Sequence, residues 1–254
     1  MDEYVIIFDT ETTGLNFLED RIIEFAYVIA KRIGYSYLAV IKKRDYFVKQ
    51  DIDIEKKEID RLDIFGNKLT ISKLTHITNS MLEMGISEEE LINIIKKDFY
   101  SLENATIVAY NANFDINMIK GLFLRHNENI DILKTVNYLD LLTIYKDYFP
   151  YDKTLDENGQ ALGHRLDSAV KTLEVEVKNT HRAIDDVLAT LEVYKKILKQ
   201  GTKIRPYVNL FGFNPKFESK LERIDFIDYC PQPYGKKTPV LFYSLKKFRE
   251  LKRN

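Results

Sequence analysis

The sequence predicts an α/β protein in which helices cover both faces of a mixed β-sheet. Two observations support this fold class. After residue 85, apolar runs of strand length alternate with segments whose apolar residues recur at helical spacing, and this alternation is typical of a sheet covered by helices. Before residue 50, β-rich segments follow one another closely, which favours an antiparallel meander because neighbouring strands in sequence usually pair.

The composition is that of an ordinary globular protein. Of the 254 residues, 45% are hydrophobic and 30% are charged, which is enough apolar material for a core. The single cysteine excludes an internal disulfide framework and a cysteine zinc site. No apolar run is long enough for a transmembrane helix, and the acidic first residues do not resemble a signal peptide. We therefore expect a cytoplasmic protein with no membrane partner.

The first half of the chain is expected to hold a meander of three strands. Its strands are expected in the β-rich segments 4–8, 21–30, 37–41 and 46–48. The stretch 49–72 is polar and carries both charges, which indicates a surface excursion with one short helix. Residues 72–84 have the form of a turn and a short helix.

The second half carries the helix signals. Ser87 can cap a helix, and Glu90 three residues later completes a capping box. Gly201 stands where the last and strongest helix should stop. Strands are expected at 105–110 and 135–140, and helices after residue 87, after residue 115, and at 141–149, 165–173 and 183–198.

Two carboxylates stand at the end of the first strand. Asp9 and Glu11 are two residues apart, so in extended backbone they point to the same face. Like charges side by side repel unless a cation lies between them, and hard ions such as Mg²⁺ prefer oxygen ligands. Two acidic residues at the end of a strand more often belong to a solvated turn than to a metal site. The other motifs in the chain must therefore distinguish the two interpretations.

Two further groups of polar residues stand later in the chain. Asn111, Phe114 and Asp115 follow an apolar strand and open a helix, at the edge of α/β sheets where ligands bind. His181 precedes the last helix, and Asp186 follows five residues later. Taken singly, each acid could be a favourable residue in the first turn of a helix, and the histidine could be a surface or capping residue.

The three groups in this order resemble the DEDDh branch of the DnaQ-like 3′–5′ exonucleases, the family of the proofreading ε subunit of bacterial DNA polymerase III. The resemblance covers roughly residues 4–198 and extends to the stretches 22–24, 74–78 and 166–167. It implies a ribonuclease-H-like fold with a five-stranded mixed sheet of order 3-2-1-4-5, flanked by helices. Strand 2 would run antiparallel to its neighbours, which agrees with the meander.

The resemblance also implies a catalytic set. Two divalent cations, Mg²⁺ or Mn²⁺, would be held by the carboxylates of Asp9, Glu11, Asp115 and Asp186. Asp9, on the central strand, is our candidate for the bridging ligand, and His181 would be the general base. Such a set suits phosphodiester hydrolysis, because two ions can stabilise both the attacking and the leaving oxygen. A histidine that titrates near neutral pH can accept the proton of the attacking water. Asp185 is expected to be only a helix first-turn acid.

Further residues around the acids would bind the terminal nucleotide. The pocket residues implied by the resemblance are Thr10, Thr12, Thr13, Gly14, Leu15, Asn111 and Phe114. Tyr110 stands where the ε subunit has histidine, which predicts an altered pocket without loss of activity. Asp140 occupies a position that is often acidic in the family, and we expect it to support the site from behind.

The last 54 residues lie outside the resemblance. We predict an exonuclease domain at 1–200 and a basic extension of short strands and a helix at 201–254. Within the extension, strands are expected at 225–229 and 240–243, and a basic helix at 245–252. The extension carries twelve Lys and Arg against five Asp and Glu, and its basic and aromatic side chains could track a phosphate backbone and stack on bases. The alternative is a packing appendage that covers a sheet edge or forms a dimer.

The leading functional hypothesis is a metal-dependent exonuclease that releases nucleoside 5′-monophosphates from the 3′ end of single-stranded DNA. One alternative is the same chemistry on RNA, as in oligoribonuclease and ribonuclease T, because the sequence does not show whether the pocket admits a 2′-hydroxyl. Another is a proofreading subunit within a DNA polymerase assembly. An inactive binding module is disfavoured because all five catalytic positions are filled.

Overall fold

The computed structural model describes residues 3–34, 37–62, 66–156, 159–177 and 182–209, together with two short strands at 221–223 and 241–243. A five-stranded mixed sheet runs through the molecule in the order β3-β2-β1-β6-β7. β1 lies at its centre, antiparallel to β2 and parallel to β6, and β6 is parallel to β7. The predicted fold class, strand order and meander are therefore confirmed. The strands of this sheet are β1 (Tyr4–Thr12), β2 (Ile22–Arg32), β3 (Leu38–Phe47), β6 (Ala105–Ala109) and β7 (Asn137–Asp140).

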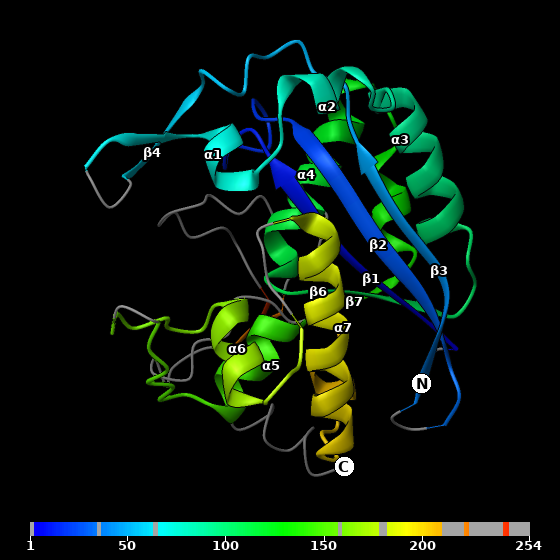
Figure 1. The fold of residues 1–254 in the computed structure, drawn as a ribbon. Coiled ribbons are helices and arrows are strands. Elements are labelled where there is room, and N and C mark those ends of the chain that lie inside the picture. Colours follow the sequence, from blue (N-terminus) through cyan, green and yellow to red (C-terminus); the bar gives the residue numbers. More distant parts are fainter. Residues whose placement is uncertain are drawn as a thin grey trace.

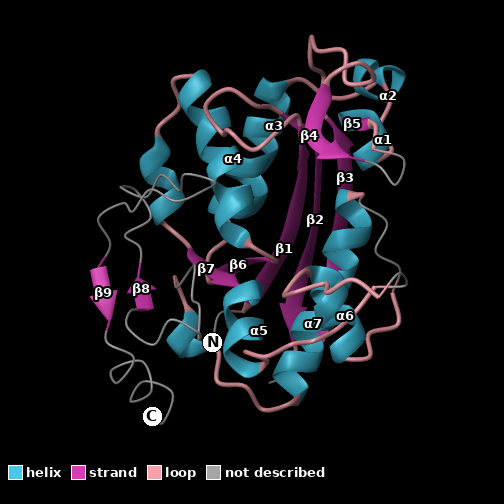
Figure 2. Cartoon of the chain, turned by 90° about the vertical axis from the view of Figure 1, so that its left-hand side faces the viewer, coloured by secondary structure: helices cyan, strands magenta, loops and turns pink. Residues whose placement is uncertain are grey.

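Helices cover both faces of the sheet, as the alternation of apolar patterns predicts. Figure 2 shows α3 and α4 on one side of the strands and α6 and α7 on the other. Each side has its own buried apolar core, one built with the last helix and one with the helix after β6. The α-helices are α1 (Ile71–Thr75), α2 (Asn79–Glu83), α3 (Glu88–Ile95), α4 (Ala112–Arg125), α5 (Leu141–Tyr148), α6 (Leu166–Thr172) and α7 (Ala183–Lys199). Shorter turns are a π-helical turn at Lys96–Tyr100 and 3₁₀ turns at Ile130–Lys134 and Arg205–Tyr207.

Local signals place most of the helix ends correctly. Ser87 and Glu90 form the predicted capping box at the start of α3. α3 continues directly into the π-helical turn and so reaches Tyr100. Gly201 follows the last helix with φ +77°, a conformation that glycine adopts at little steric cost.

The structure corrects three expectations about the first half. The two short strands expected at 37–41 and 46–48 are one continuous strand, β3. The excursion at 49–72 contains a hairpin of β4 (Glu58–Leu62) and β5 (Lys68–Thr70) and leads into α1. The turn and short helix expected at 72–84 are two short helices, α1 and α2. A small core of five isoleucine and leucine side chains lies beneath this excursion, which projects from the sheet in Figure 1.

The first residues after α7 pack on the domain. Ile204 and Tyr207 are buried in the core on the α7 side. Asn209 donates its N–H to the carbonyl oxygen of Tyr138 at 2.9 Å and accepts the N–H of Tyr138 at 2.9 Å. These contacts place residues 207–209 along β7, at the edge of the sheet.

Little of the extension is described beyond this point. β8 (Leu221–Arg223) pairs antiparallel with β9 (Leu241–Tyr243), and β9 falls within the expected last strand. The expected strand at 225–229 and basic helix at 245–252 lie outside the described residues, and the domain boundary at residue 200 stays a prediction. Within the described part of the chain, no helix has both the length and the apolar content needed to cross a membrane.

Candidate active site

Asp9 and Glu11 lie near the carboxyl end of the central strand. β1 is extended here, and Asp9 and Glu11 pair with Ala26 and Glu24 of β2. Their side chains therefore leave the same face of the sheet. The β1–β2 register shifts between Glu11 and Thr12, where the regular ladder ends and the chain turns away.

Asp186 completes an acidic cluster with these two residues. It lies in the first turn of α7, which packs against β1 and β2 and crosses them in Figure 1. One carboxylate oxygen from each of Asp9, Glu11 and Asp186 lies within 4.8 Å of the others. The Oδ1 atom of Asp186 is buried and has no hydrogen-bond partner, which is costly for an oxygen that could accept two bonds.

Asp115 lies beside this cluster but is held differently. It is in the first turn of α4 and is only 2% exposed. Its Oδ1 accepts the N–H of Thr10 at 3.0 Å and the hydroxyl of Thr10 at 2.7 Å. The residue between Asp9 and Glu11 in the sequence thus orients the carboxylate that comes from the other side of the sheet.

Burial, and then neighbouring negative charges, raise the pKa values of these carboxyl groups. Desolvation, followed by the charges of Asp115 and Asp186, raises the pKa of Asp9 well above its usual range. Desolvation and then the charge of Asp186 raise the pKa of Glu11 to about 9. Desolvation also raises the pKa of Asp115 to about 7, against the hydrogen bonds from Thr10.

Asp186 shows the same behaviour. Desolvation, followed by the charges of Asp167 and Asp185, raises its pKa to about 7. Burial and neighbouring negative charges raise the pKa of all four carboxyl groups, and a bound cation would favour their ionised forms. The donor set consists of carboxylate oxygens, and one of them lacks any partner. These residues therefore fit a hard divalent ion.

The loop after Glu11 is organised around one carboxylate. Asp20 accepts hydrogen bonds from the hydroxyl of Thr13 at 3.0 Å, the N–H of Asn16 at 2.8 Å and the ammonium of Lys57 at 3.0 Å. A Cβ atom on Gly14 would lie 2.4 Å from Asp20 Oδ2, so a larger residue at position 14 would displace the Asp20 carboxylate. Lys57 ties the loop to the excursion.

The predicted nucleotide-binding residues divide by exposure. Thr10 and Thr13 are buried, and their hydroxyls are engaged inside the protein. The hydroxyl of Thr12 donates to the carbonyl oxygen of Gly14 at 2.7 Å. Leu15 is 51% exposed and is the member of this set with the most free apolar surface.

The turn between β6 and α4 carries Asn111 and Phe114. Asn111 has φ +67° and precedes the helix, a conformation that asparagine tolerates better than most residues. Its N–H donates to Asp140 Oδ1 at 3.0 Å. Phe114 packs against the core on the α4 side.

The remaining predicted residues have distinct positions. The hydroxyl of Tyr110 donates to the carbonyl oxygens of His164 and Arg165 at 2.7 and 3.2 Å, so this side chain braces the start of α6. Asp185 lies in the first turn of α7. His181 lies outside the described residues, and its role stays a prediction.

Sequence reasoning missed two residues next to the cluster. Glu24 is completely buried in β2, and Arg182 binds its carboxylate with Nε at 2.9 Å and Nη2 at 2.6 Å. A glutamate inside an apolar run is the signal that could have found this pair, because a buried charge needs a partner.

Comparisons with known proteins show the family of the chain. Residues 6–194 match the RNase_T family, described as exonuclease. The chain is 31% identical over 223 residues to the PolC-type DNA polymerase III of Bacillus cereus and 26% identical over 208 residues to that of Bacillus subtilis. These matches cover 82% and 80% of this chain, which spans only 12% of the length of each polymerase.

Structural likeness leads to the same fold. The crystal structure of E. coli exonuclease I in complex with a dT13 oligonucleotide superposes with a TM-score of 0.59 at 22% identity. The superposition covers 77% of this chain and 41% of the exonuclease I chain. The chain therefore belongs to the RNase_T exonuclease family.

Proposed function

We propose that this protein removes nucleoside 5′-monophosphates from the 3′ end of single-stranded DNA, using two divalent cations and a histidine base. The observation that carries the proposal is the cluster of Asp9, Glu11 and Asp186, whose oxygens lie within 4.8 Å of one another. DEDD exonucleases use divalent metals, and Mg²⁺ or Mn²⁺ would suit these oxygen ligands.

Each residue of the set has a role in this proposal. Asp9, Glu11, Asp115 and Asp186 would hold the ions, and Asp9 lies on the central strand of the sheet. When bound, the ions stabilise the charge that develops on the attacking and leaving oxygens. Thr10 keeps Asp115 in place through two hydrogen bonds. His181, five residues before Asp186, accepts the proton of the attacking water.

The loop at 12–15 and the turn at 111–114 receive the terminal nucleotide in this proposal. Leu15 is the exposed apolar side chain that can lie against a base. Thr12, Thr13 and Gly14 shape the backbone beside it. Asn111 and Phe114 belong to the turn that opens α4, the helix that carries Asp115.

DNA is the favoured substrate because the relatives named above are a DNA polymerase and a nuclease bound to a dT13 oligonucleotide. The polymerase relatives also support a second candidate, in which this chain removes mispaired 3′ ends for a polymerase. Both candidates use the same site and reaction. They differ in the DNA end that is preferred and in the partner.

The test is hydrolysis of 5′-labelled oligonucleotides by the purified full chain with Mg²⁺. DNA and RNA of one sequence are compared, each with a free 3′-hydroxyl and with a blocked 3′ end. We expect a ladder that shortens from the free 3′ end of DNA, release of nucleoside 5′-monophosphates, and no reaction in EDTA. The Asp9→Ala variant should be inactive.

Three outcomes would change the proposal. Equal activity of Asp9→Ala and the wild type would remove the catalytic assignment. Faster shortening of RNA than of DNA would replace the substrate. A marked preference for a mispaired over a paired primer end, absent from single-stranded DNA, would favour the proofreading candidate.

A further inference from the structure

The carboxylate of Glu24 lies in the interior of the protein and is held on both oxygens. Its side chain is 0% exposed. Arg182 donates from Nε to Oε1 at 2.9 Å and to Oε2 at 3.2 Å, and from Nη2 to Oε1 at 2.6 Å. The N–H of Ala183 donates to Oε2 at 3.1 Å. A buried carboxylate persists only when it is paired in this way.

These contacts fix the start of α7. The first N–H groups of a helix have no partner within the helix, and Arg182 at the N-cap position provides no side-chain cap. Glu24 supplies the missing acceptor for Ala183 from the neighbouring strand. The guanidinium of Arg182 also lies 4.9 Å from the ring centre of Phe47 and 3.7 Å from Asp45. One arginine thus ties the first turn of α7 to both β2 and β3.

The same turn of α7 carries Asp186. The N–H of Asp186 donates to the carbonyl oxygen of Arg182 at 3.1 Å, so a shift of Arg182 moves the Asp186 backbone directly. On the other side of the cluster, Glu11 lies opposite Glu24 in the β1–β2 ladder. Glu24 therefore lies opposite Glu11 in the sheet and also binds the helical turn that carries Asp186.

We propose that Glu24 and Arg182 are positioning residues that hold Asp186 at its distance from Asp9 and Glu11 and thereby set the affinity of the protein for divalent cations. This inference rests on the proposed function, since it takes the acidic cluster as the metal site. It adds two residues that touch neither the ions nor the nucleic acid.

Charge and position make opposite predictions for Arg182. If Arg182 acted only through its positive charge, its removal would strengthen cation binding at the nearby carboxylates. If it positions Asp186, its removal weakens binding because the ligand oxygens separate. Lysine keeps the charge but lacks the planar fork that binds both carboxylate oxygens, so Arg182→Lys isolates the effect of geometry.

The experiment is calorimetric titration of the metal-free full chain with Mn²⁺, without nucleic acid. Partners behind metal ligands typically contribute about 10- to 100-fold in metal affinity. We therefore expect Arg182→Gln to bind Mn²⁺ about tenfold more weakly and Arg182→Lys roughly threefold more weakly than the wild type. Binding by Arg182→Gln that is as tight as in the wild type, or tighter, would overturn the proposal.

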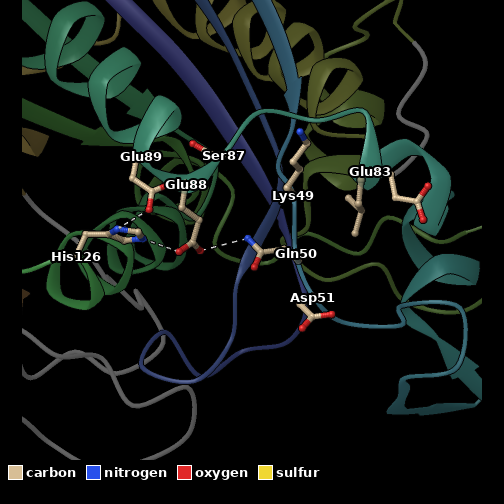
Figure 3. A pocket seen from close by; sticks show the side chains of 9 residues that line it. Lys49, Gln50, Asp51, Glu83, Ser87, Glu88, Glu89 and His126 are labelled. Atoms are coloured by element: carbon tan, nitrogen blue, oxygen red, sulfur yellow. Dashed lines mark hydrogen bonds and ion pairs between the residues drawn. The ribbon is translucent and has the colours of Figure 1, made fainter.

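A matched pair on the other face of the sheet serves as control. Glu88 binds Arg125 at 3.2 Å and His126 at 2.8 Å, and it is also in the first turn of a helix. Figure 3 shows Glu88 with Gln50 and His126 in a pocket of about 550 Å³. Glu88→Gln should leave the Mn²⁺ affinity unchanged within twofold. An equal loss in this variant would mean general destabilisation and would overturn the proposal.

Two further measurements complete the test. Thermal unfolding identifies variants that do not fold. If Arg182→Gln does not fold, the Mn²⁺ affinity of Arg182→Lys tests the proposal on its own. A pure charge effect predicts an unchanged affinity for this variant, because lysine keeps the positive charge. The rate of Arg182→Lys at saturating Mn²⁺ should return to within about threefold of the wild type, and a rate that stays low would contradict a role in metal affinity. Wild type that binds Mn²⁺ but degrades no DNA would refute the proposed function alone.

Discussion

Asp140 and the cluster of Asp9, Glu11 and Asp186 lie at the same edge of the sheet but differ in their hydrogen-bond donors. Asp140, at the end of β7, is 2% exposed, and its Oδ1 accepts the N–H groups of Asn111, Ala112 and Leu142 at 3.0 to 3.2 Å. Its Oδ2 accepts the hydroxyl of Thr143 at 2.7 Å. In the cluster of Asp9, Glu11 and Asp186, by contrast, the carboxylates face one another, and Asp186 Oδ1 has no partner.

The difference separates an acid that stabilises the fold from acids that repel one another and lack hydrogen-bond donors among the described residues. Burial raises the pKa of Asp140, but the hydrogen bonds from Thr143, Ala112 and Leu142 favour its charged form. Those donors come from the starts of α4 and α5, so Asp140 joins two helices. The cluster has no comparable set of donors among the described residues, and its charges oppose one another. Burial alone therefore does not identify a site, whereas an unsatisfied buried carboxylate does.

The largest effect is expected from Asp186→Asn. Loss of one ligand to a catalytic ion should lower kcat/KM by roughly 10³-fold. The metal-free protein should not be destabilised, because the change removes repulsion from Asp167 and Asp185. Activity and urea unfolding are measured on the same preparation. Asp185→Asn, one residue away in the same helical turn, should retain activity within a few-fold; an equal loss in both variants would contradict the comparison.

The next largest effect is expected from Asp140→Ala. Four donors lose their acceptor, and those of Ala112 and Thr143 are buried. Each buried donor left without an acceptor costs about 1–3 kcal/mol, so we expect a loss of about 3–4 kcal/mol in the free energy of unfolding. Ser87→Ala, which removes an exposed helix cap, should cost only about 1 kcal/mol. Urea unfolding measures both. Similar losses for the two variants would show that the hydrogen bonds to Asp140 contribute no more to the free energy of unfolding than one helix cap does.

A smaller effect is expected from pH in the absence of metal. Glu11, with a pKa of about 9, and Asp115 and Asp186, with pKa values of about 7, keep protons that the unfolded chain has already released. The folded state thus binds more protons, and stability present below about pH 4 is lost as pH rises through 7 towards 9. Each group contributes at most about 1.4 kcal/mol per pH unit, and we expect a net loss of at least about 2 kcal/mol between pH 5.5 and 8.

Unfolding in EDTA and in excess Mg²⁺ at several pH values measures this loss. Bound cations should flatten the pH dependence, because they stabilise the ionised carboxylates. Asp186→Asn should flatten it in part without metal. If the metal-free protein instead became more stable between pH 5.5 and 8, the acidic cluster would not be the cause of the pH dependence.

The smallest effect is expected from Tyr110→Phe. This change deletes the hydroxyl that donates to the carbonyl oxygens of His164 and Arg165, which should cost about 1 kcal/mol of stability. Because Tyr110 braces a loop and is outside the acidic cluster, kcat should change by less than about threefold. Steady-state kinetics and urea unfolding measure the two quantities. A loss of activity as large as that of Asp186→Asn would place Tyr110 among the reacting groups.

The sheet was predictable where burial dictates the pattern. β1, β2 and β6 are buried on both faces, so their sequences are continuous apolar runs that predict strands. Lys42, Lys43 and Arg44 interrupt the apolar residues of β3, so the sequence shows two short β-rich segments where the structure has one strand. An edge strand faces solvent along much of its length, so charges there do not end it.

The site was predictable as a set of residue types and only partly as a geometry. Chain order and spacing singled out the acids, and three of them meet in one cluster. The bonds from Thr10 to Asp115 and from Arg182 to Glu24 join residues 105 and 158 positions apart. Such pairs depend on how a helix packs on the sheet, which local patterns do not encode. His181 and the basic extension stay predictions.

The strand-like segment after α7 has a practical consequence for anyone who shortens this protein. Tyr207 is fully buried, and Asn209 completes the backbone bonding of Tyr138 on β7. A truncation after Gln200 would remove both and leave an open strand edge, which invites self-association. A minimal exonuclease fragment should therefore end after Asn209, and aggregation of the shorter fragment would report the loss of this cover.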